Sequence, residues 1–239
     1  MKRLLAAGYE KIFQICRCWR GGERGRLHLP EFTLLEWYRS GCDYFGLMTE
    51  CEEMIRAVAE ALNRGPCLRF QGRDIDLSGP WKRITVREAF NRYTTRTAEE
   101  ALALGLFDEE MVQEIEPNLG LGNPTFLYDY PRQRGSLARL KADDPETAER
   151  FELYMGGIEI ANAFSELNDP AEQRKRFEEE ETLRRTLGKA SYPSPERFLS
   201  ELETLPPSAG IALGVDRLAM VFFDLATIDD VVAFTPEEL

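Results

Sequence analysis

Residues 210–220 constrain the fold of this chain more than any other segment. In this segment a run of small residues passes directly into an expected helix. Gly210, Ala212 and Gly214 alternate along an expected strand, and Arg217 follows in the first turn of an expected helix. Small side chains let the backbone approach a ligand closely, and the arginine offers a planar cation for a phosphate or a base. We therefore expect one wall of a nucleotide site. The alternative is a tight turn with an exposed arginine, because a glycine-rich turn alone is weak evidence.

The length and composition predict one globular domain. With 239 residues, of which 43% are hydrophobic, the chain can bury a large core. No repeat and no linker rich in proline, glycine and serine divides it, so we expect one domain over residues 1–239. Its apolar runs are too short for a secretory segment or a membrane span, which predicts a soluble, cytoplasmic protein without a membrane partner. A single histidine and five scattered cysteines argue against zinc sites and histidine-dependent hydrolase chemistry.

The charge of the chain points to a small ligand. Its net charge of -12 argues against a general nucleic-acid-binding surface, since such surfaces need clustered lysines and arginines. Residues 1–39 nevertheless hold eight basic and four acidic side chains. A local basic patch in an acidic protein fits a small anion better than a long polyanion.

The residue pattern predicts strands at residues 11–20, 32–38, 67–77 and 124–130, the first two antiparallel and joined by a long loop. Apolar residues at helical spacing predict an amphipathic packing helix at residues 43–62. No linker separates two cores, and the segments that resemble a ligand site lie at opposite ends of the sequence. We therefore expect that these site-like segments converge within one sheet.

Two capping boxes predict a small helical insertion at about residues 85–120. Thr85 with Glu88, and Thr97 with Glu100, each match the pattern that opens a helix. Two further segments are expected at the surface: a highly charged helix at residues 169–187, and a proline-rich connection with one or two helical turns at residues 191–207.

Residues 149–169 predict a hairpin that turns at the two glycines of residues 156–157. Such a turn makes Glu152 and Glu159 cross-strand neighbours. Two adjacent carboxylates repel unless a cation lies between them, so Mg²⁺ or a substrate ammonium would stabilise the pair. Glu166 follows Glu159 by seven residues and reaches the same ligand only if a bulge or loop shifts the strand alternation. The alternative is that these glutamates form exposed salt bridges.

Three segments, in this order, resemble a class II aminoacyl-tRNA synthetase of the lysyl type. Residues 13–38, with Arg-Leu-His-Leu-Pro-Glu-Phe at 26–32, are similar to motif 2 of that class. Residues 157–169 read Gly-Ile-Glu-Ile-Ala-Asn-Ala-Phe-Ser-Glu-Leu-Asn-Asp, and residues 210–220 are similar to motif 3. The resemblance covers almost the entire chain. It implies an α+β fold, in which a class II synthetase-like antiparallel sheet is flanked by helices.

Within this group the chain most resembles the lysyl-tRNA synthetase paralogues that attach (R)-β-lysine to a lysine of elongation factor P. Residues 2–9 and 124–126 match them, and Ala212 stands where lysyl-tRNA synthetases usually carry glycine. A methyl group at this place is worth about 1–3 kcal/mol in choosing between lysine and β-lysine. The resemblance implies ATP and Mg²⁺ as cofactors, an aminoacyl adenylate of lysine or β-lysine, and elongation factor P as acceptor. The absence of an OB domain disfavours tRNA as a partner.

The resemblance also implies a role for each site residue. Arg20 and Arg217 are the expected catalytic residues. Phe32 and Arg217 would enclose the adenine, and Glu152 and Glu159 would bind Mg²⁺. The expected substrate-binding residues are Tyr38, Glu166 and Ala212, and the expected ATP-binding residues are Arg20, Gly22, Glu23, Phe32, Glu159, Ile160, Gly214 and Arg217.

The chain departs from the family pattern at two places. The usual Arg-Asn-Glu of motif 2 is Arg20-Gly21-Gly22, with Glu23 one place later. The family's motif 1, its homodimer segment and a Thr-Ser-Pro-Glu element precede the residue that matches Met1. The sequence is therefore expected to be either a fragment of a longer protein or a shortened paralogue. Two alternatives to the ligase stay open: a tRNA-charging catalytic domain of the lysyl-tRNA synthetase type, and a truncated, non-catalytic nucleotide-binding or regulatory paralogue.

Overall fold

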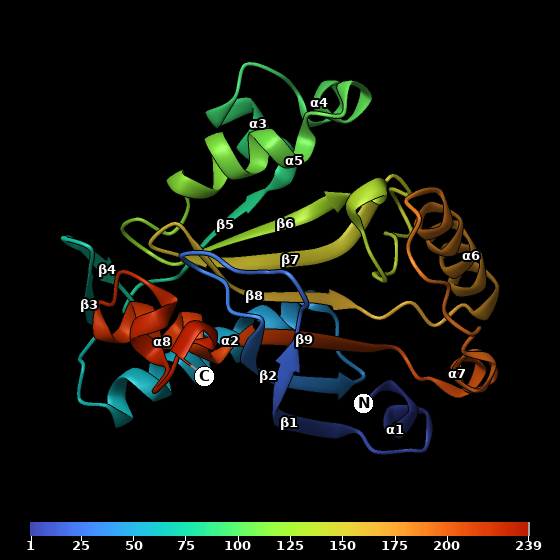
Figure 1. Ribbon diagram of the computed structural model, residues 1–239, viewed down its shortest axis with the longest axis horizontal. Coiled ribbons are helices and arrows are strands. Elements are labelled where there is room, and N and C mark those ends of the chain that lie inside the picture. Colours follow the sequence, from blue (N-terminus) through green and yellow to red (C-terminus); the bar gives the residue numbers. More distant parts are fainter. Residues whose placement is uncertain (239) are drawn as a thin grey trace.

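The structure is a computed structural model that describes residues 1–238. One sheet with strand order β1-β2-β9-β8-β7-β6-β5 forms its centre (Figure 1). All neighbouring strands are antiparallel except β5 and β6, which are parallel. The strands are β1 (Lys11–Trp19), β2 (Glu31–Ser40), β5 (Lys82–Thr85), β6 (Thr125–Pro131), β7 (Thr147–Met155), β8 (Ile158–Ser165) and β9 (Ser208–Gly214). The expected α+β fold, an antiparallel sheet flanked by helices, is confirmed.

Helices and a small second sheet surround this centre (Figure 1). The second sheet pairs β3 (Cys67–Phe70) with β4 (Arg73–Asp76), as the sequence predicted for residues 67–77. The helices are α1 (Lys2–Ala6), α2 (Tyr44–Ala61), α3 (Val86–Tyr93), α4 (Ala98–Leu104), α5 (Phe107–Glu110), α6 (Pro170–Thr186), α7 (Glu196–Glu201) and α8 (Val215–Phe223). Helices α6 and α7 confirm the two surface segments expected from the sequence.

Helix α2 forms because Asp43 caps it and because its apolar residues recur on one face. The Asp43 carboxylate accepts a hydrogen bond from the Gly46 backbone N–H, and the helix buries its apolar face against β8 and β9. Trp37, Ala163 and Ile211 belong to this core, from β2, β8 and β9 respectively. Strand side chains alternate between the two faces of a sheet. The residues next to these three therefore point to the opposite face, where a cavity lies.

The segment at residues 85–120 is helical, as predicted. Both capping boxes are present, with Thr85 and Thr97 each bonded to the third residue of its helix. Its helices pack around their own apolar cluster beside β6, and Phe90 stacks on Phe107 with ring centroids 4.9 Å apart. The assignment of the whole chain to one domain with this insertion stays a prediction. Within residues 1–238, no helix combines the length and the apolar character that crossing a membrane requires.

Candidate active site

A cavity of about 220 Å³ lies on the face of the sheet that points away from α2. Side chains of β2, β8 and β9 form its floor, and the loop between β1 and β2 closes one side. Phe32 and Tyr38 line it from the two ends of β2. They are six positions apart along an extended strand, which corresponds to about 20 Å. The cavity is therefore long enough for a nucleotide and a second small molecule placed end to end.

The cavity brings together most of the site residues predicted from the sequence. Ten of them line it: Arg20, Glu23, Phe32, Tyr38, Glu159, Ile160, Glu166, Ala212, Gly214 and Arg217. Two do not. Gly22 lies exposed in the loop after β1 with φ +82°, and Glu152 lies on β7 opposite the cavity residue Asn162.

The predicted hairpin is present, but its register differs from the expected one. Strands β7 and β8 join at residues 156–157, yet Glu152 pairs with Asn162, and Glu159 pairs with Tyr154. The prediction that Glu152 and Glu159 are cross-strand neighbours is therefore wrong. The turn itself sets this offset, because it pairs Met155 with Ile158 and Tyr154 with Glu159 and leaves Glu152 two residues further along β7. Beyond this point a bulge leaves one extra residue in β8, because Leu153 pairs with Ala161 while the next residue pairs with Glu159.

This bulge decides which carboxylates share the cavity. The extra residue is Ile160, and it resets the alternation of side chains between Glu159 and Asn162. Glu159, Asn162 and Glu166 consequently all line the cavity. The sequence required such an irregularity for Glu166 to face the same ligand as Glu159, and the structure confirms it.

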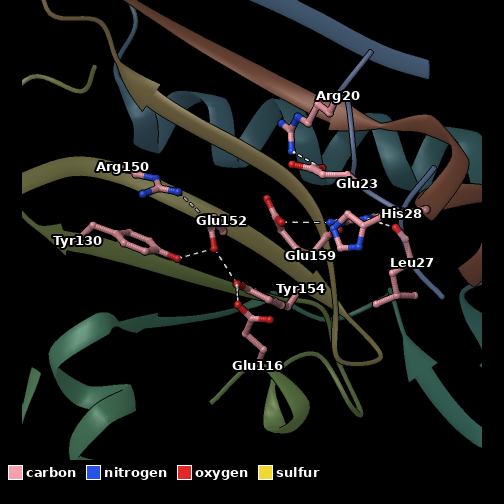
Figure 2. A network of polar contacts seen from close by, with 11 residues as sticks. Arg20, Glu23, Leu27, His28, Glu116, Tyr130, Arg150, Glu152, Tyr154 and Glu159 are labelled. Carbon is pink, nitrogen blue, oxygen red and sulfur yellow. Dashed lines mark hydrogen bonds and ion pairs between the residues drawn. The ribbon is translucent and has the colours of Figure 1, made fainter. Parts of the chain in front are cut away.

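Glu152 is buried in a set of hydrogen bonds (Figure 2). The hydroxyls of Tyr130 and Tyr154 both donate to its Oε2 at 2.6 Å, and Arg150 donates to its Oε1 at 2.5 Å. Arg150 also donates to the side-chain oxygen of Asn162, which lines the cavity. These contacts fix the Glu152 carboxylate beside the cavity and link it, through Arg150, to Asn162 in the cavity wall.

The carboxyl group of Glu159 has a strongly raised pKa. Burial, and next the negative charge of Glu152, raise its pKa to about 7, although Arg217 opposes the shift. The Arg217 guanidinium lies 3.1 Å from a Glu159 carboxylate oxygen. The same two causes, burial and Glu152, raise the pKa of Glu116. Excess negative charge is therefore concentrated where these carboxylates meet.

Arg217 is held from several sides at the start of α8. It donates to the backbone oxygens of Leu27 and Glu159 and lies 2.7 Å from His28 Nε2. Burial and the Arg217 charge lower the pKa of His28, which keeps that ring neutral and able to accept. Arg217 thus ties the loop after β1 to β8.

At the Phe32 end of the cavity, Arg20 lies over an aromatic ring. Its guanidinium is 5.3 Å from the centre of the Phe32 ring and 3.5 Å from Glu23. Arg20 and Glu23 are largely exposed, so these contacts hold it weakly. The arrangement leaves the Arg20 guanidinium free to turn toward an anion.

At the Tyr38 end, a buried carboxylate and a phenol meet. Glu166 is 1% exposed, and burial raises its pKa, although Lys2 opposes the shift. Burial and the Glu166 charge also raise the pKa of Tyr38, so its hydroxyl stays protonated. A Cβ at Gly210 would lie 2.6 Å from Glu166 Oε1 and 2.3 Å from the Tyr38 ring. Glycine is therefore required for these two groups to approach each other.

Comparison with known proteins identifies the family to which this site belongs. The family described as tRNA synthetases class II (D, K and N) matches residues 1–238. The chain belongs to this family.

Curated relatives of this class II synthetase domain fall into two groups. An "Elongation factor P--(R)-beta-lysine ligase" of Proteus mirabilis is 42% identical over 98% of the chain and 74% of its own length. The protein of the same name from Pectobacterium atrosepticum is 40% identical over 99% of the chain and 75% of its own length. A "Lysine--tRNA ligase" of Thermoanaerobacter pseudethanolicus is 37% identical over 98% of the chain, which spans about half (51%) of that protein.

The class II synthetase site has a donor set that fits Mg²⁺. Glu152 and Glu159 lie on the same face of the sheet, and the charge of Glu152 raises the pKa of Glu159. A divalent cation between them would remove this repulsion. Mg²⁺ keeps several waters and needs only one or two carboxylates together with substrate phosphates. Two protein carboxylates are therefore a sufficient set, although residues 1–238 hold no group of three or more such side chains placed for a metal.

Several residues of this synthetase site were not singled out from the sequence. Tyr130, Arg150 and Tyr154 surround Glu152, and Lys2 contacts Glu166. The parity of β7 places Arg150, Glu152 and Tyr154 on one face, which is a usable signal. No local pattern links Lys2 to Glu166, because 164 positions of chain separate them.

Proposed function

We propose that this chain is an ATP-dependent ligase that activates lysine or (R)-β-lysine and transfers it to a lysine of elongation factor P. Family membership and the names of the Proteus and Pectobacterium relatives support the reaction class and the acceptor. The observation that carries the proposal is the order of charges in one cavity. Guanidinium groups lie toward the Phe32 end, and a buried carboxylate beside a phenol lies at the Tyr38 end.

The first step joins the amino acid to the nucleotide. An oxygen of the amino-acid carboxylate attacks the α-phosphorus of ATP, and the bond from that phosphorus to pyrophosphate breaks. We assign Arg20 to the α-phosphate and the carboxylate, where a guanidinium offsets the charge that grows on the phosphoryl oxygens. Bound Mg²⁺, held by Glu152 and Glu159, would add positive charge on the phosphates.

The adenine and the amino acid bind at opposite ends in this proposal. The adenine takes the place of the Arg20 guanidinium on the Phe32 ring, which sends Arg20 toward the phosphates, and Arg217 covers its other face. Gly22, Glu23, Ile160 and Gly214 complete the proposed ATP contacts. The distal ammonium of the amino acid binds Glu166 and Tyr38, because a carboxylate and a phenol oxygen both accept hydrogen bonds from an ammonium.

The second step transfers the aminoacyl group. The ε-amine of the acceptor lysine attacks the carbonyl carbon of the adenylate, AMP leaves, and the amine nitrogen loses a proton. Ala212 lines the cavity opposite Glu36, two residues from Gly210 at the Tyr38 end, and its methyl group fills space that glycine would leave open. We propose that this methyl group favours (R)-β-lysine over lysine by about 1–3 kcal/mol.

Pyrophosphate exchange and acceptor labelling test the proposal. We expect (R)-β-lysine, and less effectively lysine, to stimulate ATP–pyrophosphate exchange, and elongation factor P to gain the mass of one aminoacyl group. Arg20→Met should abolish the exchange. Arg17→Met, at an exposed arginine of β1 outside the cavity, is the matched control and should leave it unchanged. ATP binding without exchange for either amino acid would instead support a non-catalytic nucleotide-binding protein.

A second candidate is a tRNA-charging domain, which the identity to the Thermoanaerobacter lysine–tRNA ligase favours. It makes the same adenylate and differs only in the acceptor. An aminoacylation assay with lysine tRNA, run beside the elongation factor P assay, separates the two. Transfer to tRNA alone would replace the first proposal.

A further inference from the structure

The ammonium-binding end of the cavity already contains a lysine. Lys2 Nζ lies 2.5 Å from Glu166 Oε2 and 5.2 Å from the centre of the Phe164 ring. Its side chain is 15% exposed and that of Glu166 is 1% exposed. Phe164 and Glu166 both line the cavity. Lys2, on α1, therefore places an ammonium group there, the same chemical group that the side chain of a lysine substrate carries.

The contact is a buried ion pair with little support around it. Neither Lys2 Nζ nor the two Glu166 carboxylate oxygens make a well-directed hydrogen bond to another group. In a buried pair of this kind, the loss of hydration offsets much of the attraction between the charges. Removing only one partner is strongly unfavourable, since the other charge stays buried alone. An exchange of one ammonium for another avoids that cost.

The backbone of α1 is anchored apart from the Lys2 side chain. Arg3 makes two hydrogen bonds of 2.6 Å to the Glu201 carboxylate, and Leu5 is buried among apolar residues that include Leu199 and Leu202. The Lys2 side chain is a flexible four-carbon stem with a terminal ammonium. It can leave Glu166 without moving the helix that carries it.

We propose that Lys2 is an internal competitor that occupies the substrate's ammonium subsite in the free protein and is displaced from Glu166 by the incoming amino acid. This inference rests on the proposed function for the identity of the displacing ligand. It follows that part of the binding energy of the amino acid is spent on displacing Lys2. Removing the Lys2 ammonium therefore strengthens binding.

Amine labelling of the intact protein tests the displacement directly. We expect Lys2 Nζ to react slowly with an amine-acylating reagent in the free protein, and faster when lysine or (R)-β-lysine saturates the site. Glu166→Gln should give the fast rate without ligand, which defines the released state. Exposed Lys11 is the internal reference and should react at one rate throughout. An unchanged or slower Lys2 rate at saturation overturns the inference, because Lys2 would then remain on Glu166.

Binding to a variant provides the second measurement. Calorimetry should show that Lys2→Met binds lysine about tenfold more tightly than the unaltered chain, a gain of about 1.4 kcal/mol. Lys11→Met is the control and should bind as the unaltered chain does. Weaker binding to Lys2→Met, with Lys11→Met unaffected, contradicts competition and makes Lys2 a residue that positions Glu166.

Different experimental results would contradict the ligase proposal and the proposal that Lys2 is a competitor. Pyrophosphate exchange with unchanged Lys2 labelling overturns the competitor and leaves the ligase standing. Amino-acid-dependent labelling of Lys2 without exchange or transfer contradicts the ligase and leaves the competitor standing. Absence of amino-acid binding to both the unaltered chain and Lys2→Met overturns both.

Discussion

Glu159 and Glu166 line one cavity although they are seven residues apart in the same strand segment. In a regular strand, residues separated by an odd number of positions point to opposite faces. The bulge at Ile160 removes this difference in parity. The phosphate-side carboxylate of the proposed ligase thus lies on β8, and its ammonium-side carboxylate lies on the residue that directly follows β8.

Glu166→Gln should weaken the use of lysine and (R)-β-lysine. The amide keeps the shape but loses the charge that receives an ammonium, which costs about 2–3 kcal/mol and lowers kcat/KM roughly 30- to 150-fold. Steady-state exchange kinetics, with amino acid as the varied substrate, measure this. Glu203→Gln, an exposed glutamate outside the cavity, is the control. An unaltered kcat/KM in Glu166→Gln would remove Glu166 from the substrate site.

Gly210→Ala should damage the same end of the cavity by a steric route. The added Cβ would lie 2.3 Å from the Tyr38 ring and 2.6 Å from Glu166 Oε1, distances that require both groups to move. Such overpacking costs about 1–3 kcal/mol of unfolding free energy and should raise the KM for the amino acid.

Gly214→Ala in the same strand is the matched control for stability. Its added Cβ meets Arg217 at an ordinary 3.8 Å. Urea unfolding and exchange kinetics compare the two variants. Equal unfolding free energies and equal KM values for the amino acid in both variants would mean that the close approach of Tyr38 and Glu166 to Gly210 affects neither stability nor substrate binding.

The sequence predicted elements and their types well because short-range chemistry determines them. Thr85 and Thr97 cap their helices through residues three positions away, and two adjacent glycines set the β7–β8 turn. The turn also sets the pairing of Tyr154 with Glu159, but the register beyond the bulge at Ile160 was not predictable, because that bulge depends on how β7, β8 and β9 pack. The ion pair between Lys2 and Glu166 joins segments that are 164 positions apart and meet only in the folded protein.

The resemblance to known motifs identified part of the site that local sequence patterns could not predict. Ten of the site residues that it implied line one cavity, although neither Arg20 nor Arg217 has a local signal that separates it from other arginines. It did not reveal the groups that hold Glu152. Those contacts come from Tyr130 on a neighbouring strand and from Arg150, whose partner could not be chosen by spacing alone.

The pH dependence of stability should report on Glu159. Its pKa is raised in the folded state to about 7, from 4.5, so the folded state binds more protons than the unfolded state between these values. Stability contributed by this group is present below pH 4.5 and is lost as the pH rises toward 7. Urea unfolding from pH 4.5 to 8 should show a steeper decline for the unaltered chain than for Glu159→Gln. Parallel curves would contradict the raised pKa.

Protonation of Glu159 should also control the affinity for Mg²⁺. Mg²⁺ binds an ionised carboxylate, so the apparent affinity for Mg²⁺ in the presence of ATP should rise with pH through about 7. Glu159→Gln should bind Mg²⁺ and ATP more weakly and without that rise. Calorimetric titration with Mg²⁺ at fixed ATP, at pH 6 and pH 8, measures the difference. A pH-dependent rise that persists in Glu159→Gln would assign it to another group.

Tyr130→Phe should lower the unfolding free energy of the protein while leaving the shape of the core nearly unchanged. Tyr130 is 2% exposed, and its hydroxyl is one of two that donate to Glu152 Oε2. Losing that donor leaves a buried carboxylate oxygen with fewer partners, which costs about 1–3 kcal/mol. Tyr9→Phe, at a 59% exposed tyrosine, is the control for removal of a hydroxyl and should change the unfolding free energy little. Because Glu152 also loses a group that orients it, Tyr130→Phe should need more Mg²⁺ for half-maximal exchange. Equal unfolding free energies and equal Mg²⁺ requirements for both variants would show that Tyr154 and Arg150 alone hold Glu152 in place.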